Sequence, residues 1–176
     1  MADRQMGFFD VLMARRSVRQ FTEEPVPMEV LEAIVQAGLE APTGCNAQLR
    51  QYLIITDAQV LAQLRPVSKP MATTPAAIVQ LIEPTATRWG DFHLQDAAAS
   101  VQNMLLAAVA LGYASCWVEG PVRRMQDELR RILGVPAGVD VSAILPIGRP
   151  AERPGRPEKT SLAQATHYNA YGQRKG

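Results

Sequence analysis

Apolar residues recur at helical spacing in several stretches of the chain, and turn residues mark where these stretches end. Between positions 27 and 40, Val30, Leu31 and Ile34 fall on one face of a helix that starts near Pro27 and ends at the sequence APTG. The amphipathic sequence VRRMQDELRRIL is followed by Gly134, and glycine commonly ends a helix. Helices are therefore predicted over residues 7–14, 27–40, 58–64, 91–111 and 122–134.

Four shorter runs are largely apolar and contain many β-branched residues, a pattern typical of buried strands. They are YLIIT, AAIVQLIE, YASCWVEG and VDVSAILPIG, at residues 52–56, 76–83, 113–120 and 139–148. Because these runs alternate with the predicted helices, the sequence indicates an α/β or α+β sheet protein. No repeat and no linker divides the chain, so residues 1–176 are predicted to form a single domain.

The C-terminal tail, from about residue 148 to residue 176, is rich in proline and arginine and only weakly hydrophobic. Proline fixes one backbone angle and lacks an amide hydrogen, so this segment is predicted to be extended rather than helical. An extended tail that cannot form its own core often lies across a second subunit. The sequence thus predicts a homodimer in which the tail is an arm that packs on the partner.

Composition and charge narrow the class of protein. Of 176 residues, 47% are apolar and 20% charged, as in an ordinary folded chain, and the formal net charge is only +1. This balance disfavours nucleic acid as a partner. Residues 97–118, the longest stretch of low charge, are interrupted by polar side chains, and the N-terminus lacks the apolar core of a signal peptide. Cys45 and Cys116 fit no metal-binding spacing, so we expect a cytoplasmic protein with no membrane segment and no metal site.

The sequence RRSVR at positions 15–19 concentrates positive charge in a chain that is otherwise nearly balanced. Arg15, Arg16 and Arg19 follow a short predicted helix and can converge on one anion, while Ser17 adds a hydroxyl donor. Phosphate suits this set because planar guanidinium groups match its oxygens in pairs. The same residues can instead form a solvated basic patch at a helix end, and the motif alone favours that simpler interpretation.

The sequence APTGCNAQ at positions 41–48 leads from a predicted helix into a loop with two amide side chains. Asn46 and Gln48 supply both donors and acceptors, as the polar edge of a heteroaromatic ring requires, although such residues are also ordinary in turns. Cys45 is not predicted to be a nucleophile, because His93 and His167 lie far from it in sequence.

Two further stretches carry candidate ligand contacts. Glu119 and Gly120 end a predicted strand, and a glycine at such a position lets a ligand approach the backbone closely. An ordinary turn from strand to helix explains the same residues without a ligand. Four cations in the tail are additional anion ligands or simply part of a soluble extension: Arg149, Arg153, Arg156 and Lys159.

In this order and spacing, the motifs resemble the FMN-dependent nitroreductase family over about residues 8–171. The matching stretches are RRSVRQF, PVPMEVLEAIVQAGLEAPTGCNAQ, TPAAIVQLIE, DAAASVQNMLLAAVALGYASCWVEG and LPIGRPAERP. The resemblance implies an α+β fold with a central, mainly antiparallel sheet flanked by helices. It also implies an intertwined homodimer whose C-terminal arms embrace the partner and whose interface holds two FMN molecules.

The resemblance also implies roles for individual residues. The FMN phosphate and ribityl chain would be held by Arg15, Arg16 and Ser17, and Arg19 would lie near the flavin N1 and O2. Asn46 and Gln48 match amides that address the polar edge of the ring, and Glu119 and Gly120 match the strand end that faces it, with the Gly120 amide directed at N5. Gly148, Arg149 and Lys159 match a turn and a phosphate contact in the tail.

The function implied is that of an oxidoreductase in which NAD(P)H reduces FMN at N5. The reduced flavin then passes electrons to a nitroaromatic, a quinone or a similar electron-poor acceptor in ping-pong fashion. No side chain is expected to act as a general acid or base, and Arg19 and Gly120 tune the flavin. The alternative is a flavin-binding sensor or carrier with little turnover.

Departures from the family pattern leave some details open. Leu49-Arg50 stands where the family often has Pro-Trp, and either Lys159 or Arg156 is the phosphate contact. The region between residues 68 and 91 is short, which suggests that a lid is absent and that the pocket is open. Trp89 or Phe92 can line this pocket, but packing in the core is the favoured interpretation for each of them. The physiological acceptor and the choice between NADH and NADPH are not set by these motifs.

Overall fold

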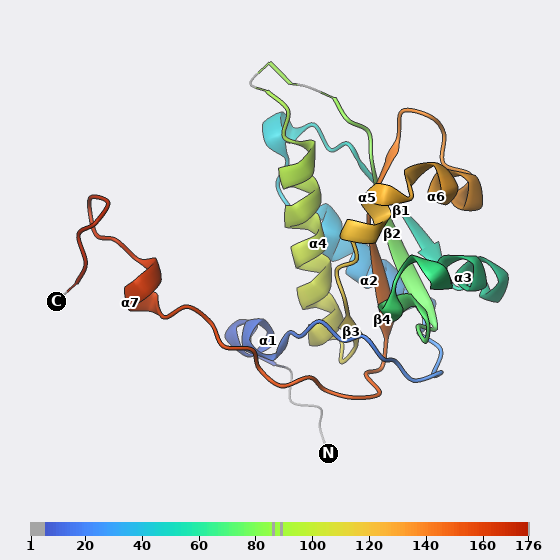
Figure 1. Cartoon of the computed structure of the whole chain (residues 1–176), viewed down its shortest axis with the longest axis horizontal. Coiled ribbons are helices and arrows are strands. Elements are labelled where there is room, and N and C mark those ends of the chain that lie inside the picture. The colour runs from blue at the N-terminus through green and yellow to red at the C-terminus, as the bar shows by residue number, and fades with distance from the viewer. Residues whose placement is uncertain (1–5, 86, 89, 176) are drawn as a thin grey trace.

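The structure is a computed structural model that describes residues 6–85, 87–88 and 90–175. Its centre is a four-stranded sheet in the order β1-β2-β4-β3, in which every neighbouring pair is antiparallel (Figure 1). The strands span Arg50–Ile55 (β1), Ala76–Ile82 (β2), Ala114–Ser115 (β3) and Asp140–Gly148 (β4). An isolated parallel bridge between Ser17 and Ser115 extends the sheet beyond β3. The predicted α+β class with a mainly antiparallel sheet is therefore confirmed.

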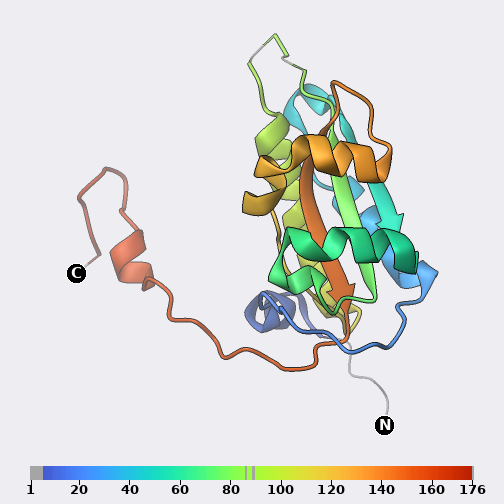
Figure 2. The ribbon, with the colours of Figure 1, turned by 45° about the vertical axis from the view of Figure 1, so that its right-hand side comes forward.

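Helices cover both faces of this sheet, as Figure 2 shows. One face packs against α2 (Met28–Leu39) and α4 (His93–Ala110), and the other against α3 (Ala58–Leu64), α5 (Gly120–Arg124) and α6 (Gln126–Leu133). Strand β2 contributes alternate residues to both cores, and all seven of its residues are buried. A strand covered on both faces loses the alternation of apolar and polar residues, which explains why every residue of β2 except Gln80 is apolar.

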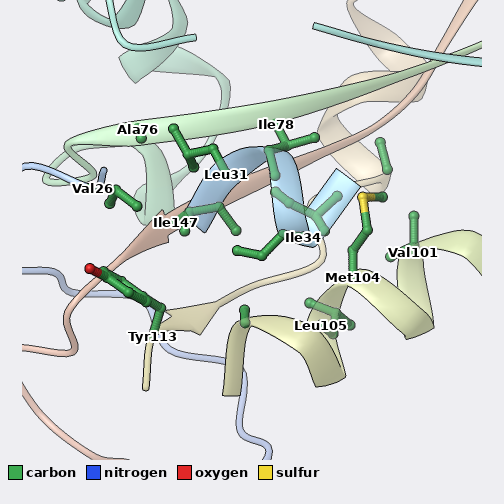
Figure 3. Packing of buried hydrophobic residues seen from close by; sticks show 13 residues of the cluster. Val26, Leu31, Ile34, Ala76, Ile78, Val101, Met104, Leu105, Tyr113 and Ile147 are labelled. Carbon is green, nitrogen blue, oxygen red and sulfur yellow. The ribbon is translucent and has the colours of Figure 1, made fainter. Parts of the chain in front are cut away.

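The core between the sheet and helices α2 and α4 is closely packed (Figure 3). Ile34 of α2 and Met104 of α4 are fully buried beside Ile78 of β2. Gly38 lets the two helices meet, because a Cβ atom there would lie 2.8 Å from Cγ of Met104. Buried aliphatic side chains of this kind contribute roughly 1.5–3 kcal/mol each, so this core holds α4 firmly against the sheet.

The third predicted strand, residues 113–120, is much shorter than expected. The ladder between this segment and β4 is regular at Ala114 and Ser115 and resumes at Val118, whose amide donates to the carbonyl of Ile144 over 3.0 Å. In that register Pro146 lies opposite Cys116, and proline has no amide hydrogen to donate. The gap in the ladder therefore has a direct cause in the sequence of β4.

The single helix predicted over residues 122–134 is also wrong, because the structure has two helices separated at Met125. The Gln126 side chain donates to the carbonyl of Val122 over 3.1 Å and to that of Val141 over 2.7 Å, and its oxygen accepts from the Val141 amide over 3.0 Å. This side chain takes over a backbone role in the helix and fixes α6 to the edge of β4.

Residues 151–175 leave the body as an almost wholly exposed arm, visible in Figures 1 and 2 as the red segment. Its first half has no regular secondary structure, whereas α7 (Leu162–Ala165) is a short helix within the tail that the sequence predicts to be extended. Ser161 and Gln164 form a capping box, which starts this turn of helix. That the tail packs on a partner subunit, and that residues 1–176 form one domain with the tail as an arm, stay predictions.

No helix among the described residues is long and apolar enough to cross a membrane.

Arg50, which departs from the family pattern, is buried and terminates α2. Its guanidinium donates to the carbonyls of Gly38, Leu39 and Ala41 over 3.2, 3.3 and 2.9 Å. Leu39 and Ala41 lie at and just beyond the end of α2, where carbonyls lose their intrahelical donors, whereas the Gly38 carbonyl also accepts from the Ala41 amide over 3.3 Å. The arginine therefore has a structural role in joining α2 to β1.

We expect Arg50→Met to lower the free energy of unfolding by about 2–4 kcal/mol, because it leaves buried carbonyls without donors. Urea denaturation measures this change, and the exposed Arg65 provides a matched control. Arg65→Met should change stability by less than about 0.5 kcal/mol. Equal stability of the two variants would contradict the role assigned to Arg50.

Candidate functional site

Two segments from opposite ends of the chain line one cleft of about 470 Å³, which we call the arginine cleft. The first segment follows helix α1 (Phe8–Ala14), and the second is the beginning of the arm. The polar side chains on its walls are Arg15, Arg16, Ser17, Arg19, Arg156 and Lys159. The structure thus brings together all four residues predicted from the RRSVR motif, and it adds both of the alternatives for the phosphate contact in the tail.

The chain around the motif is held by backbone hydrogen bonds to neighbouring elements. The amide of Arg15 closes α1 by donating to the carbonyl of Val11 over 3.1 Å, after which the chain becomes extended. The amide of Val18 donates to the carbonyl of Ser115 over 3.0 Å, and the Val18 side chain is buried. Because side chains alternate along an extended chain, Ser17 and Arg19 lie on the opposite side from Val18. The motif is therefore anchored to β3.

The cations of the arginine cleft lack carboxylate partners. None of the ion pairs formed by described residues includes Arg15, Arg16, Arg19, Arg156 or Lys159. Arg16 donates to the carbonyls of Met13 and Arg15 over 2.7 and 2.8 Å, and its buried Nε has no hydrogen-bond partner. Five like charges around one cleft repel one another unless an anion neutralises them. The cleft is consequently well suited to a phosphate group.

Cys116 lies beneath this cleft and is almost fully buried. Burial raises the pKa of the Cys116 thiol, while the positive charge of Arg19 and a hydrogen bond with Ser17 oppose that rise. The thiol therefore favours its neutral form and contributes no charge of its own to the cleft. Neither Cys45 nor Cys116 forms a disulfide in the structure. The described part of the chain holds no group of three or more potential metal ligands.

Glu119 and Gly120 are connected to the arginine cleft by the segment that begins at Ser115. Five extended residues span roughly 16 Å at about 3.3 Å per residue. Gly120 begins α5, is exposed and has no atom within 4 Å of the position of a Cβ, so its surroundings are open. The Glu119 carboxylate accepts from Arg123, at 2.6 Å from Nη2 and 2.8 Å from Nε. Open backbone at the end of this segment leaves space for a flat ligand.

The loop that carries Asn46 and Gln48 has a strained backbone. Both residues and Cys45 adopt the left-handed conformation, with φ of 55°, 51° and 53°. The loop is held in place from α4, where Asp96 Oδ1 accepts from the amide of Gly44 over 2.9 Å. Strain of this kind costs roughly 1–3 kcal/mol per residue and persists where the surroundings enforce it, often at functional sites.

Within one protomer, this loop is not part of the arginine cleft. Asn46 and Gln48 do not line it, and the loop contacts the first turn of α4, whereas α1 packs at the other end of that helix (Figure 1). A helix of 18 residues is about 27 Å long. The predicted contacts to the phosphate and to the ring edge are therefore far apart in a single chain.

Gly148 and Arg149, predicted from the resemblance, occupy a packed corner beside β3. A Cβ on Gly148 would lie 2.9 Å from Cδ of Pro75. Arg149 lies 4.2 Å above the ring of Tyr113, donates to the carbonyl of Gly112 over 2.8 Å and lies 3.6 Å from the Glu24 carboxylate. These contacts give both residues a structural role at the base of the arm, and neither lines the arginine cleft.

Two features of the site were not foreseen. Asp96 is the one acidic residue of the largely apolar helix α4. An isolated acidic residue in such a helix is a sequence signal for a specific role, here the hydrogen bond that holds the loop. His93, which lies far from Cys45 in sequence and is assigned no role by the motifs, lines a pocket that also contains Glu119. Of the two aromatic residues proposed to line an open pocket, Phe92 packs against Gly44 and Trp89 lies outside the described residues.

Comparisons with known proteins agree with this geometry. The sequence model of the Nitroreductase family matches residues 12–83 and 78–149. A protein of Methanothermobacter thermautotrophicus, provisionally named NADH dehydrogenase/NAD(P)H nitroreductase, is 26% identical over 155 residues, which cover 86% of this chain and 81% of that protein. The NADPH-flavin oxidoreductase of Vibrio harveyi is 25% identical over 177 residues, which cover 92% of this chain and 73% of that protein.

A solved structure shows the same fold. The FMN-dependent nitroreductase of Clostridium difficile R20291 superposes with a TM-score of 0.80 at 24% identity, over 92% of this chain and 98% of that one. The family match itself includes the RRSVR motif, the strained loop and Glu119-Gly120. From this match over most of its length, we conclude that the chain belongs to the nitroreductase family.

Proposed function

We propose that this protein is an FMN-dependent oxidoreductase that takes electrons from NAD(P)H and passes them to a nitroaromatic, a quinone or a similar electron-poor acceptor. The observation that carries the proposal is the arginine cleft, in which five cations and one hydroxyl from two distant segments surround a space without a carboxylate. The names of the relatives, which refer to NAD(P)H nitroreductase and NADPH-flavin oxidoreductase activities, support the same assignment.

The residues of the cleft fit the phosphate of FMN. A phosphate monoester carries a charge of about −1.5 to −2 at neutral pH and presents three acceptor oxygens. Arg15, Arg16 and Ser17 provide donors on one wall, and Arg156 and Lys159 face them from the arm. The orphaned Nε of Arg16 is a donor that such a phosphate would satisfy. We therefore assign both Arg156 and Lys159, the two alternatives for the phosphate contact in the tail, to the FMN phosphate.

The remaining residues are assigned to the flavin ring. When bound, FMN would supply the redox chemistry, namely acceptance of a hydride from NAD(P)H at N5 and transfer of electrons to the acceptor in a ping-pong sequence. Arg19 would stabilise negative charge at N1 and O2, because a fixed cation acts there without reorganisation. The Gly120 amide, at the open start of α5, would be the donor to N5.

A second subunit would complete the site. Asn46 and Gln48 cannot reach the arginine cleft of their own chain, so we assign them to the FMN bound by a partner protomer. Exposed apolar residues support a homodimer: Phe8 and Phe9 on α1 are 67% and 77% exposed, and Tyr171 in the arm is 93% exposed. Such side chains are normally covered at an interface.

A cytoplasmic location for the protein stays a prediction from the sequence.

The central experiment is a spectrum of the purified protein. We expect a yellow protein that binds FMN with 1:1 stoichiometry and whose visible absorption is bleached by NADH or NADPH without oxygen. A quinone or a nitroaromatic compound should restore the colour. Protein that cannot be reconstituted with FMN would contradict the proposal, and protein that binds FMN without turnover would indicate a flavin sensor or carrier instead.

The two ends of the RRSVR motif should have different effects when they are changed. Arg15→Gln is expected to weaken FMN binding by about 10- to 100-fold, because it removes charge-assisted hydrogen bonds to the phosphate. Arg19→Gln is expected to slow flavin reduction by about tenfold or more while it affects FMN binding less. Fluorescence titration and anaerobic stopped-flow measure the two effects, with Arg65→Gln as the exposed control. Equal losses of affinity with unchanged reduction rates would refute this division.

Removal of residues 160–176 tests the arm. This truncation retains Lys159 but deletes α7 and the exposed Tyr168 and Tyr171. We expect a dimer in the full chain, and a weakened dimer with lower FMN occupancy in the truncated one. Light scattering coupled to size exclusion gives the mass. An unchanged dimer with full FMN content would show that the arm does not hold the subunits together.

A further inference from the structure

A second pocket, of about 260 Å³, lies beside the strand end that we assign to the flavin ring. We call it the His93 pocket. Its polar lining is formed by His93, Glu119, Arg123, Gln126, Asp140 and Ser142. Because Glu119 directly precedes Gly120, a molecule in this pocket lies next to the residue whose amide we assign to N5. The pocket is therefore in the right place for an electron acceptor.

His93 is held in one orientation by Asp91. It is the first residue of α4, its side chain is only 16% exposed, and its ring Nδ1 contacts Oδ1 of Asp91. The same carboxylate oxygen accepts from the His93 amide over 3.2 Å. Hydrogen bonds with His93 lower the pKa of the Asp91 carboxyl, so Asp91 is ionised and accepts the Nδ1 proton. The other ring nitrogen, Nε2, is left for a further partner.

The other titratable groups that face the pocket are paired. Glu119 forms an ion pair with Arg123 at 2.6 Å, and Asp140 forms one with Arg130 at 2.5 Å. Both carboxylates are therefore engaged as acceptors by arginines, and an arginine does not release its proton in proteins. Among the described residues that line the pocket, His93 is thus the group suited to donate a proton.

We propose that His93 is the general acid that protonates the acceptor, with Asp91 as its positioning residue. This inference rests on the proposed function, since it concerns the second half of the same reaction. It goes beyond the expectation that no side chain acts as an acid or base. The observation that carries it is an oriented imidazole in a pocket shared with Glu119.

The proton balance of a quinone shows why an acid is useful. The quinone gains a hydride, which brings two electrons and one proton, and a second proton is required to form the hydroquinone. His93 in its imidazolium form donates that proton from Nε2 to the quinone oxygen on which negative charge develops. The neutral imidazole then recovers a proton from water. General acids in this role accelerate reactions by about 10²- to 10⁴-fold.

The test separates the two half-reactions by anaerobic stopped-flow with FMN-loaded protein. In His93→Gln, reduction by NAD(P)H should keep its wild-type rate, whereas reoxidation by 1,4-benzoquinone should slow by about 100-fold. Reoxidation by ferricyanide, which takes single electrons and no proton, should be unchanged and so shows that the variant is folded. His167→Gln, which changes the only other histidine of the chain, is the matched control.

The pH dependence provides a readout that a structural role would not change. Quinone reoxidation of the wild type should slow as the pH rises, because a general acid acts only in its protonated form. This dependence on pH should vanish in His93→Gln. The rate of reoxidation by ferricyanide should not depend on pH in this way in the wild type or in either variant. Asp91→Asn should lower the quinone rate by about tenfold and retain the dependence on pH.

A measurement on protein without FMN tests the pairing independently of activity. In His167→Gln protein labelled with ¹⁵N at histidine, Nδ1 of the single remaining ring should carry the proton in the neutral form, and Asp91→Asn should abolish that preference. The inference is overturned, with the proposed function intact, if His93→Gln is reoxidised by benzoquinone at the wild-type rate with the wild-type pH profile. Failure of the wild type to bind FMN or to be bleached overturns the proposed function itself.

Discussion

Unneutralised positive charge at the arginine cleft is the constraint on which the rest of the site depends. Two unit charges 4 Å apart repel by about 1 kcal/mol in water and by about 4 kcal/mol at the effective dielectric constant of a protein surface. Five cations remain together there because backbone carbonyls accept from Arg16 and Arg19, and because the chain at Val18 is bonded to Ser115. A phosphate dianion relieves this repulsion, so its binding also stabilises the junction of α1, β3 and the arm.

From that anchor, the sheet and α4 determine where the other contacts can lie. The segment after Ser115 leads away from the cleft to Gly120, and it is held to β4 by the two hydrogen bonds between Val118 and Ile144. The strained loop around Asn46 is fixed to the opposite end of α4 by Asp96. If FMN binds as proposed, a second copy of the chain is needed to bring the loop to the flavin. The proposed dimer and the proposed position of FMN would thus both follow from one geometric arrangement.

Patterns governed by local chemistry were predictable from the sequence. The largely apolar strand β2 and the helix at residues 58–64 appear where expected, and the RRSVR residues line one cleft with the tail cations. The errors arose from interactions between distant residues. Pro146 interrupts the ladder opposite Cys116, Gln126 divides one helix into two, and His93 reaches the neighbourhood of Glu119 only through the fold. None of these pairings is visible in hydrophobic periodicity.

The comparison of FMN with riboflavin as ligands tests the central claim most directly, because the two differ only by the phosphate. Titration of the apoprotein followed by flavin fluorescence should show that FMN binds at least about 100-fold more tightly than riboflavin. The double variant Arg15→Gln/Arg16→Gln should lose most of this difference while its affinity for riboflavin stays the same. Equal affinity of the wild-type protein for the two flavins would contradict the assignment of the arginine cleft to the phosphate.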